Sequence, residues 1–411
     1  MTTFFKRTAL ANDIAGKVLF TSPTSASSSG LFLAAPRRTG KSTFLREDLR
    51  PQLEAKGALV LYVDLWENRQ TDPGDAIINA IRLELAKHDG VITRLAKSTG
   101  LDKVSVAGTT FSLDRLGLEK GISLSAALSA LSDETSKLIV LIIDEAQHAI
   151  TTEGGSNALF ALKAARDELN SSRHNGLRVV ATGSNQDKLA MLRNSKDQAF
   201  FGAPLVRFPP LGKEYVAWFC QYADLGAPLN AEKVYELFVK AAFRPEILGA
   251  AADTLRFEFG IDKNVVAERF YSEILREIES TNKEALRVIH SLTPLQSSVF
   301  QVVAKAGAAY APFEAKTMES YQYFMATIAP KSDVRADIPN VQQALVALQE
   351  KGLVWKAARG VYALEDTSLG ELLQVTESDV NPIARQAPQS MTGTDGADGQ
   401  SPAPAPEIPS S

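Results

Sequence analysis

Short, almost continuously aliphatic runs alternate with segments of helical periodicity in the first half of the chain. Runs that predict strands are 31–34, 58–65, 138–143 and 177–182, with a shorter one at 206–208 before a proline pair. Helical spacing of apolar residues follows the first two runs, at 42–49 and 75–87. Continuous aliphatic strands separated by helices are typical of a parallel sheet covered on both faces. The pattern therefore predicts an α/β fold.

The pattern of predicted elements changes after Pro209 and Pro210. Four helices without intervening strands are predicted at 213–222, 231–242, 245–257 and 265–280. Further along, predicted helices at 294–304 and 341–351 precede two short strands at 353–355 and 361–364, joined by a turn at Arg359 and Gly360. A helix followed by two short strands and their turn describes a winged helix.

These changes in the predicted secondary structure set the expected domain limits. We expect an α/β domain at 1–210, a helical lid at 211–282, a winged-helix-like domain at 283–375 and a tail at 376–411. The tail is rich in Pro, Gly, Ser, Thr and Asp, and its low apolar content predicts disorder. The region 106–127 mixes Gly, Ser and Thr with short apolar patches and stays unassigned between strand and loop.

Composition excludes several classes of protein. The 411 residues are 45% apolar and 22% charged, as in globular proteins. Cys220 is the only cysteine, so no intrachain disulfide and no cysteine-cluster zinc site can form. A net charge of −4 argues against coating nucleic acid by bulk charge. No run approaches the ~20 apolar residues that span a bilayer. We expect a cytoplasmic protein without a membrane partner.

A phosphate-binding loop is predicted between the first strand and its helix. Residues Ala35, Pro36, Arg37, Arg38, Thr39, Gly40, Lys41 and Ser42 fit the Gly-x4-Gly-Lys-Ser/Thr pattern except at Ala35, which replaces glycine. Backbone N–H groups of such a loop and of the helix start point at phosphates. Lys41 is suited to the β and γ phosphates, and the Ser42 hydroxyl to Mg2+.

Two carboxylates follow the third aliphatic run directly. Asp144 and Glu145 would lie at the carboxyl end of a buried strand, where open α/β sheets bind ligands. Asp144 fits a Mg2+-associated carboxylate, and Glu145 fits the group that orients and deprotonates an attacking water.

Together, Arg37-Arg38-Thr39-Gly40-Lys41-Ser42-Thr43 and Asp144-Glu145-Ala146-Gln147 resemble the AAA+ ATPases, in particular the initiator-like and signal-transducing branches. The resemblance covers about residues 1–280 and, more loosely, the winged helix. It implies a P-loop sheet sandwich, ATP and Mg2+, and a nucleotide-binding segment that includes Thr43. It also implies a sensor 1 at Asn185 or Ser184, with Asn185 preferred, and a sensor 2 at Arg244. Family members take an arginine finger from a neighbouring subunit, for which Arg193 is the candidate in a homo-oligomer.

The expected function is ATP binding and hydrolysis as a conformational switch that controls a DNA or protein partner. Two alternatives stay open: a non-hydrolysing nucleotide-sensing module, which Glu145 disfavours, and a small-molecule kinase, which the Arg244 lid disfavours. Candidates for a duplex-DNA surface are Arg287, Lys351, Lys356 and Arg359. Nearby acids offset them, and leave a protein partner open: Glu284, Asp333, Asp337 and Glu350.

Overall fold

The computed structural model describes residues 4–20, 29–88, 90, 123–171, 173–194, 198–358, 360–365 and 369. Residues 106–122 of the unassigned region, the expected tail at 376–411 and Arg359 lie outside these described residues.

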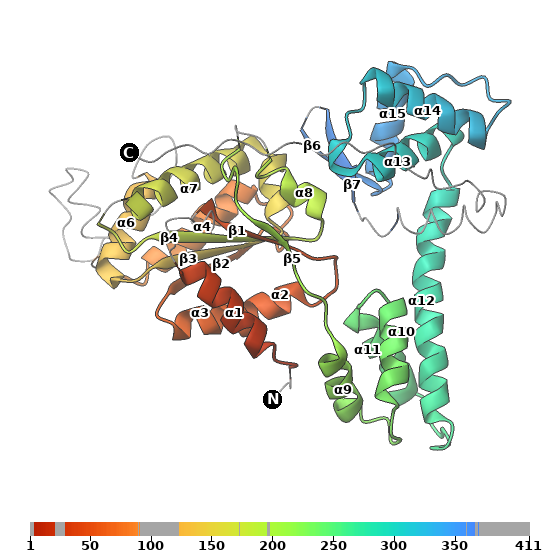
Figure 1. Cartoon of the computed structure of the whole chain (residues 1–411), viewed down its shortest axis with the longest axis horizontal. Helices are drawn as coiled ribbons and strands as arrows, with labels where there is room; N and C mark the ends of the chain where they lie inside the picture. Colours follow the sequence, from red (N-terminus) through yellow and green to blue (C-terminus); the bar gives the residue numbers. More distant parts are fainter. Residues whose placement is uncertain are drawn as a thin grey trace, which may run out of the picture. The chain divides into compact units, whose positions relative to one another are not determined.

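A five-stranded parallel sheet forms the centre of the α/β part (Figure 1). Its strands are β1 (Leu31–Ala34), β2 (Leu59–Asp64), β3 (Ile139–Asp144), β4 (Leu177–Gly183) and β5 (Leu205–Arg207). They lie in the order β2-β3-β4-β1-β5. Every residue of β3 and β4 is buried, which explains why their sequences are not alternating but aliphatic throughout. The predicted α/β fold with a parallel sheet is confirmed.

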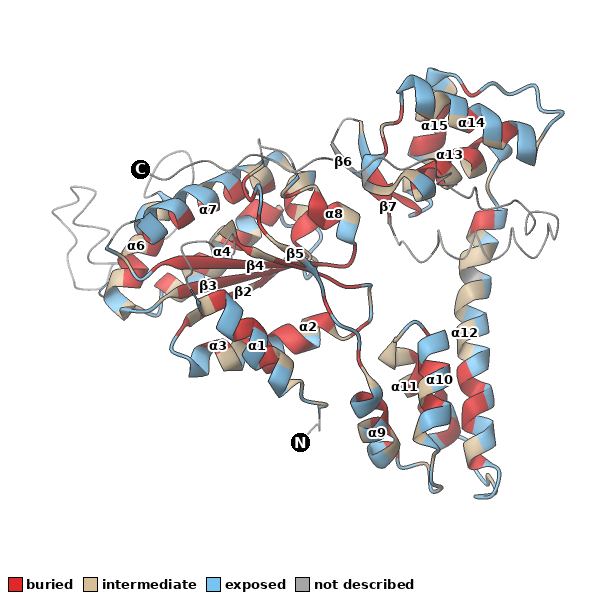
Figure 2. Cartoon of the chain, in the orientation of Figure 1, coloured by how far each residue is buried: buried red, intermediate tan, exposed pale blue. Residues whose placement is uncertain are grey.

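Helices cover both faces of this sheet. One face carries α1 (Thr8–Leu19), α2 (Lys41–Phe44), a π-helical turn at Leu45–Leu49 and α3 (Arg50–Ala55). The other carries α4 (Pro73–Leu85), α6 (Leu124–Thr135) and α7 (Glu153–Ser171). Along β3, Val140 and Ile142 pack with the first set, whereas Leu141 and Ile143 pack with the second. Figure 2 shows the buried residues concentrated in the strands and on the helix sides that face them.

The helical part after β5 has its own apolar core. It consists of α9 (Lys213–Tyr222), α10 (Ala231–Lys240), α11 (Pro245–Arg256) and α12 (Val266–His290). The first three agree with the predicted helices to within two residues. The fourth does not end near residue 280 but continues to His290, because no proline or glycine interrupts it. The expected limit between residues 282 and 283 therefore falls inside a continuous helix.

The last described part combines helices with an antiparallel hairpin. Its elements are α13 (Pro294–Ala306), a 3-10 turn at Gly307–Ala309, α14 (Ala315–Ile328), α15 (Ile338–Glu350), β6 (Val354–Ala358) and β7 (Val361–Leu364). Tyr321 is fully buried here, and its hydroxyl lies 2.6 Å from that of Tyr310. In the described part of the chain, no helix combines the length and apolar content needed to cross a membrane.

Candidate functional site

The loop after β1 has the backbone geometry of a tight phosphate-binding turn. Gly40 is left-handed, with φ 83°, and the following helix begins at Lys41. The Thr39 hydroxyl donates to the carbonyl of Pro36 over 2.7 Å and closes the turn. Ala35 does not have positive φ, so the residue that replaces the usual glycine needs none of glycine's conformational freedom. The departure from the motif therefore has no backbone cost here.

Lys41 and Asp144 form the buried centre of the site. The Lys41 Nζ donates to the Asp144 carboxylate and, at 3.2 Å, to the Thr182 hydroxyl. Ser42 Oγ donates to the second Asp144 oxygen over 2.6 Å. Burial alone would raise the pKa of Asp144, but the Lys41 charge and these hydrogen bonds outweigh it and lower that pKa. Asp144 is therefore an anion at neutral pH.

Glu145 forms an ion pair with the same lysine, Lys41. Its Oε1 is 3.2 Å from Lys41 Nζ, and Gln147 Nε2 donates to its Oε2 over 2.6 Å. Burial would raise the pKa of Glu145, yet Lys41 and Gln147 outweigh burial and lower it. Glu145 also has φ 54°, an uncommon conformation for a residue with a side chain. The strand end thus turns sharply and presents an ionised carboxylate beside the phosphate loop.

The donor set fits Mg2+ held together with phosphates. Ser42 and Asp144 supply the hard oxygen ligands that this ion prefers. Among the described residues, no three His, Cys, Asp or Glu side chains gather as a metal cage. Mg2+ commonly takes one or two protein oxygens and completes its shell with water and substrate phosphates, so two protein ligands suffice.

A pocket of about 460 Å³ opens beside this centre. It is lined by Pro36, Arg37, Arg38, Gly40, Lys41, Ser42, Thr43, Asp64, Trp66, Arg69 and Glu145. Most of the predicted loop residues lie here together with Glu145. Sequence reasoning missed Trp66 and Arg69, which belong to no motif. It also missed Tyr62, whose hydroxyl donates to Asp144 over 3.2 Å. Their position just after or within β2, beside β3, is the signal that could have found them.

The candidate sensor 1 residues follow β4. Asn185 is 2% exposed, and its Oδ1 caps the helix α8 (Gln186–Ala190) by accepting from Asp187 N and Lys188 N. Its Nδ2 donates to the backbone carbonyl of Leu364 over 3.0 Å. The alternative, Ser184, has a buried hydroxyl without a hydrogen-bond partner in the described structure.

Neither Arg244 nor Arg193 lines the pocket that holds Lys41. Arg244 precedes α11, and its Nε donates to the carbonyl of Ala241 over 3.0 Å. Burial raises the pKa of Glu246, while the charges of Arg244 and Arg38 act on that carboxylate in the opposite direction. Arg38 of the phosphate loop and Arg244 before α11 thus both act on the Glu246 carboxylate. Arg193 is tied to its own chain, because its Nε donates to the carbonyl of Ala203.

The C-terminal hairpin reaches the same region through Glu365. This carboxylate accepts from Arg37 over 2.5 Å and from Lys188 over 2.8 Å. The Lys188 side chain is fully buried, and its ammonium also lies 5.0 Å from the centre of the Trp355 ring. No sequence pattern points to this pairing, because its partners are 328 and 177 residues apart.

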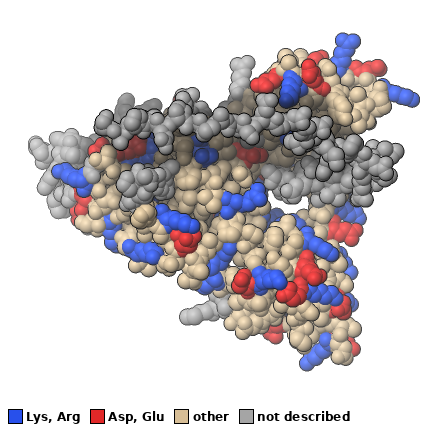
Figure 3. All heavy atoms as spheres, viewed as in Figure 1, with Lys and Arg blue, Asp and Glu red and all other residues tan. Residues whose placement is uncertain are grey.

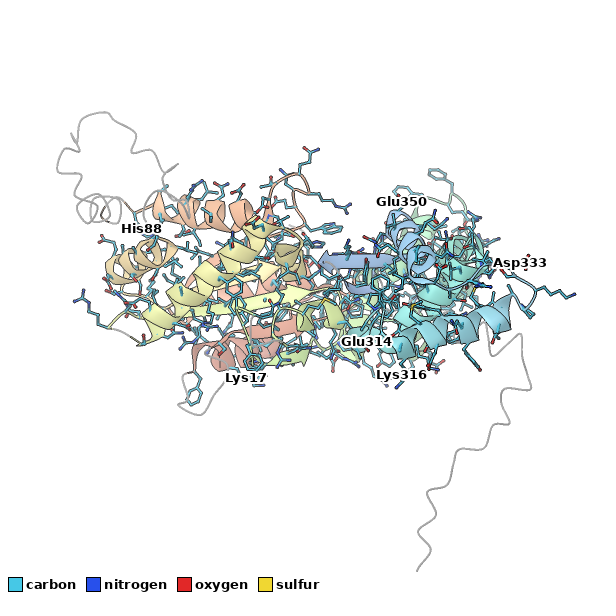
Figure 4. The ribbon with its side chains drawn as sticks, turned by 90° about the horizontal axis from the view of Figure 1, so that it is seen from above. Lys17, His88, Glu314, Lys316, Asp333 and Glu350 are labelled. Atoms are coloured by element: carbon cyan, nitrogen blue, oxygen red, sulfur yellow. The ribbon has the colours of Figure 1, made fainter. Side chains whose placement is uncertain are left out.

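Three of the four basic residues proposed for DNA, Arg287, Lys351 and Lys356, lie in the described part of the chain and are exposed. Lys351 donates to Ser291 over 3.3 Å, and Arg359 is outside the described residues. Figure 4 labels Glu314, Asp333 and Glu350 in this part of the chain, and all three are exposed. Figure 3 likewise shows acidic and basic side chains intermixed over the visible surface.

The strand order decides the fold. In β2-β3-β4-β1-β5, the phosphate loop follows the fourth strand of the row, and the Asp144-Glu145 pair follows the second. This order is typical of AAA+ ATPases, with β4 between the two motif strands. The predicted P-loop sheet is therefore confirmed, with the strand order that AAA+ ATPases share.

Comparison with known proteins gave matches among solved structures. No protein-family model matches the chain, and no curated protein sequence matches it. The ADP form of the ORC2 protein of Aeropyrum pernix is 14% identical, with 92% of this chain and 96% of that chain covered and a TM-score of 0.49. The Walker-type ATPase PABY2304 of Pyrococcus abyssi is 17% identical, with coverages of 84% and 91% and a TM-score of 0.44. AMPPCP-bound DnaA of Aquifex aeolicus is 11% identical, with coverages of 85% and 90% and a TM-score of 0.36.

Proposed function

We propose that this AAA+ chain binds ATP with Mg2+, hydrolyses it, and uses the cycle as a conformational switch that controls a partner. The observation that carries the proposal is the convergence of Lys41, Ser42, Asp144 and Glu145 at the carboxyl ends of two strands. A buried cation, a hydroxyl and two carboxylates beside a phosphate loop are the groups that this chemistry requires.

Each residue has a distinct role in the proposed reaction. Lys41 exchanges carboxylate partners for the β and γ phosphates, and backbone N–H groups of the loop surround them. Ser42 and Asp144 hold Mg2+, which neutralises charge on the phosphates when bound. Glu145 orients a water molecule and accepts its proton while the water oxygen bonds to the γ phosphorus and ADP leaves.

The candidate sensors link this reaction to the rest of the chain. The Asn185 amide has two N–H groups, of which one is used by Leu364, and we propose that the other faces the γ phosphate. Arg244, at the start of α11, is proposed to reach the same phosphate when the lid closes. A homo-oligomer with Arg193 in trans stays a proposal, which would require Arg193 to leave the carbonyl of Ala203.

Duplex DNA is the proposed partner of the winged-helix-like part, contacted through Lys351, Lys356 and Arg359. A protein is the alternative partner, because the exposed acids Asp333, Asp337 and Glu350 offset these basic residues. The size of the complex with and without ATP, each repeated with and without duplex DNA, distinguishes these partners. An ATP-dependent increase in size that requires DNA supports duplex DNA as the partner.

ATP titration of the purified chain tests nucleotide binding. Lys41→Ala removes the buried cation, and we expect the affinity for Mg2+–ATP to fall at least tenfold. Lys56→Ala is the matched control, because Lys56 is an exposed lysine just after α3. Equal ATP affinity in all three proteins would contradict the assigned phosphate site.

A further inference from the structure

The loop that follows β2 is held in a defined conformation beside the phosphate pocket. Asp64 Oδ1 accepts from Trp66 N over 2.9 Å, and Asn68 Oδ1 accepts from Gln70 N over 3.0 Å. Asp72 then caps α4 by accepting from Gly74 N over 2.7 Å. Such side-chain turns fix a loop locally. The residues between them therefore have set positions.

The Trp66 ring is in contact with three other side chains at this loop. The guanidinium carbon of Arg69 lies 3.9 Å from the centre of the Trp66 ring, and that of Arg37 lies 5.1 Å from it. The His148 ring lies 4.3 Å from the same ring. Burial lowers the pKa of His148 to about 4, so this neighbour is a neutral ring at neutral pH. Cation–π contact with tryptophan restricts where the Arg69 guanidinium can point.

Arg69 differs from Arg37 and Arg46 in its charge balance. Arg37 is paired with Glu365, and Arg46 is paired with Asp64 at 3.2 Å. Within the described part of the chain, the Arg69 guanidinium contacts the Trp66 ring but no carboxylate. It nevertheless lines the same pocket as Lys41, Ser42 and Glu145. A positioned guanidinium without a counter-charge, in a pocket built for phosphates, is suited to an anionic ligand.

We propose that Arg69 is a catalytic residue that contacts the γ phosphate of the ATP bound in its own chain. This inference rests on the proposed ATPase function. In the reaction, the bond from water oxygen to phosphorus forms, the bond from phosphorus to the ADP oxygen breaks, and the proton goes to Glu145. Arg69 transfers no proton: its N–H groups stabilise the charge on the γ-phosphoryl oxygens in the transition state. Trp66 is a positioning residue that holds the guanidinium.

The geometry favours this residue over Arg193 for the role of arginine finger. The Arg193 guanidinium donates to the carbonyl of Ala203 and to Asn194 Oδ1, so its donors are already used within the chain. Arg69 would act in cis, whereas a finger from a neighbouring subunit acts in trans. The two arrangements make opposite predictions for mixed assemblies.

Steady-state hydrolysis of Mg2+–ATP by the full chain is the first test. Arg69→Ala should lower kcat by about 100- to 1000-fold, the usual effect of removing one transition-state donor, with ATP affinity within about threefold. Affinity for ADP with aluminium fluoride, a transition-state analogue, should fall in parallel with kcat. Arg69→Lys should recover part of the rate, and Trp66→Leu should lose part of it. Arg46→Ala is the control, because Arg46 also stacks on an aromatic ring but does not line the pocket.

Mixing two inactive variants decides between cis and trans. If Arg69 acts in its own chain, Arg69→Ala mixed with Glu145→Gln stays inactive at every ratio. Recovery of hydrolysis in the mixture would show that Arg69 serves a neighbour and would overturn the proposal. If the wild-type chain hydrolyses ATP and Arg69→Ala does so at the same rate, the role of Arg69 is wrong but the proposed ATPase function stands. A wild-type chain that binds ATP without hydrolysing it would overturn the proposed ATPase function itself, and this role with it.

Discussion

The side-chain amide of Asn185 donates a hydrogen bond to the backbone carbonyl of Leu364, 3.0 Å away. The bond joins the polar end of β4 to the last strand of the hairpin, across 179 residues of sequence. The same amide is the proposed γ-phosphate sensor, and in that role one side chain would link the nucleotide site to the C-terminal hairpin.

Asn185→Asp tests that link. The substitution keeps the Oδ1 acceptor that caps α8 but removes both N–H donors. We expect slower ATP hydrolysis, because a carboxylate there would repel the γ phosphate, and a weaker attachment of the hairpin. Hydrolysis rates and limited proteolysis report the two effects separately. Unchanged values of both would remove Asn185 from the sensor role.

Glu365→Gln should destabilise the folded chain. Lys188 is fully buried, and the substitution removes the carboxylate that neutralises it. A buried charge left without its partner costs about 3 kcal/mol in free energy of unfolding. Urea unfolding measures this loss. Glu350→Gln is the control, since Glu350 is an exposed carboxylate in the same part of the chain, and it should change stability by less than about 0.5 kcal/mol.

Arg244→Ala tests the lid. We expect ATP binding to stay within a modest factor, while the ATP-dependent change in shape measured by small-angle scattering becomes smaller. A guanidinium–phosphate contact is a strong charge-assisted bond, so its loss should be visible. The same scattering response to ATP in both proteins would exclude Arg244 from the site.

The affinity for duplex DNA should depend on the salt concentration. If the winged-helix-like part contacts duplex DNA, affinity should fall steeply with salt as counterions are released. Replacing Lys351, Lys356 and Arg359 with alanine should flatten the logarithmic slope by roughly one unit per lost phosphate contact. Fluorescence anisotropy with labelled duplex, at low and moderate salt, measures the slope. Absence of binding even at low salt would leave a protein as the partner.

The fold class could be predicted because buried parallel strands leave a simple signal. Leu138 to Ile143 is aliphatic throughout, since both faces of β3 are covered, and two acidic residues follow at its carboxyl end. Local motifs also placed Lys41 and Glu145 in one pocket. Domain limits and the roles of individual site residues stay predictions.

Other features depend on contacts between distant residues and have no local signal. Glu365 meets Lys188 through tertiary structure, and Arg69 reaches the pocket because β2 lies beside β3. The length of α12 has no clear signal in the sequence, because its continuation past residue 280 begins with the polar run 281–284. The helices α1, α7 and α14 were not predicted either, although each buries an apolar face.

Single-turnover and steady-state assays of Glu145→Gln test the central claim most directly. Glu145 is proposed to activate water, not to hold phosphate, so the variant should bind Mg2+–ATP with near wild-type affinity and retain it unhydrolysed. Lys41→Ala provides the contrast, because it should lose binding. The account predicts trapped ATP in Glu145→Gln with turnover reduced by at least 100-fold. Turnover at the wild-type rate would contradict the assignment of Asp144 and Glu145 as the hydrolytic pair.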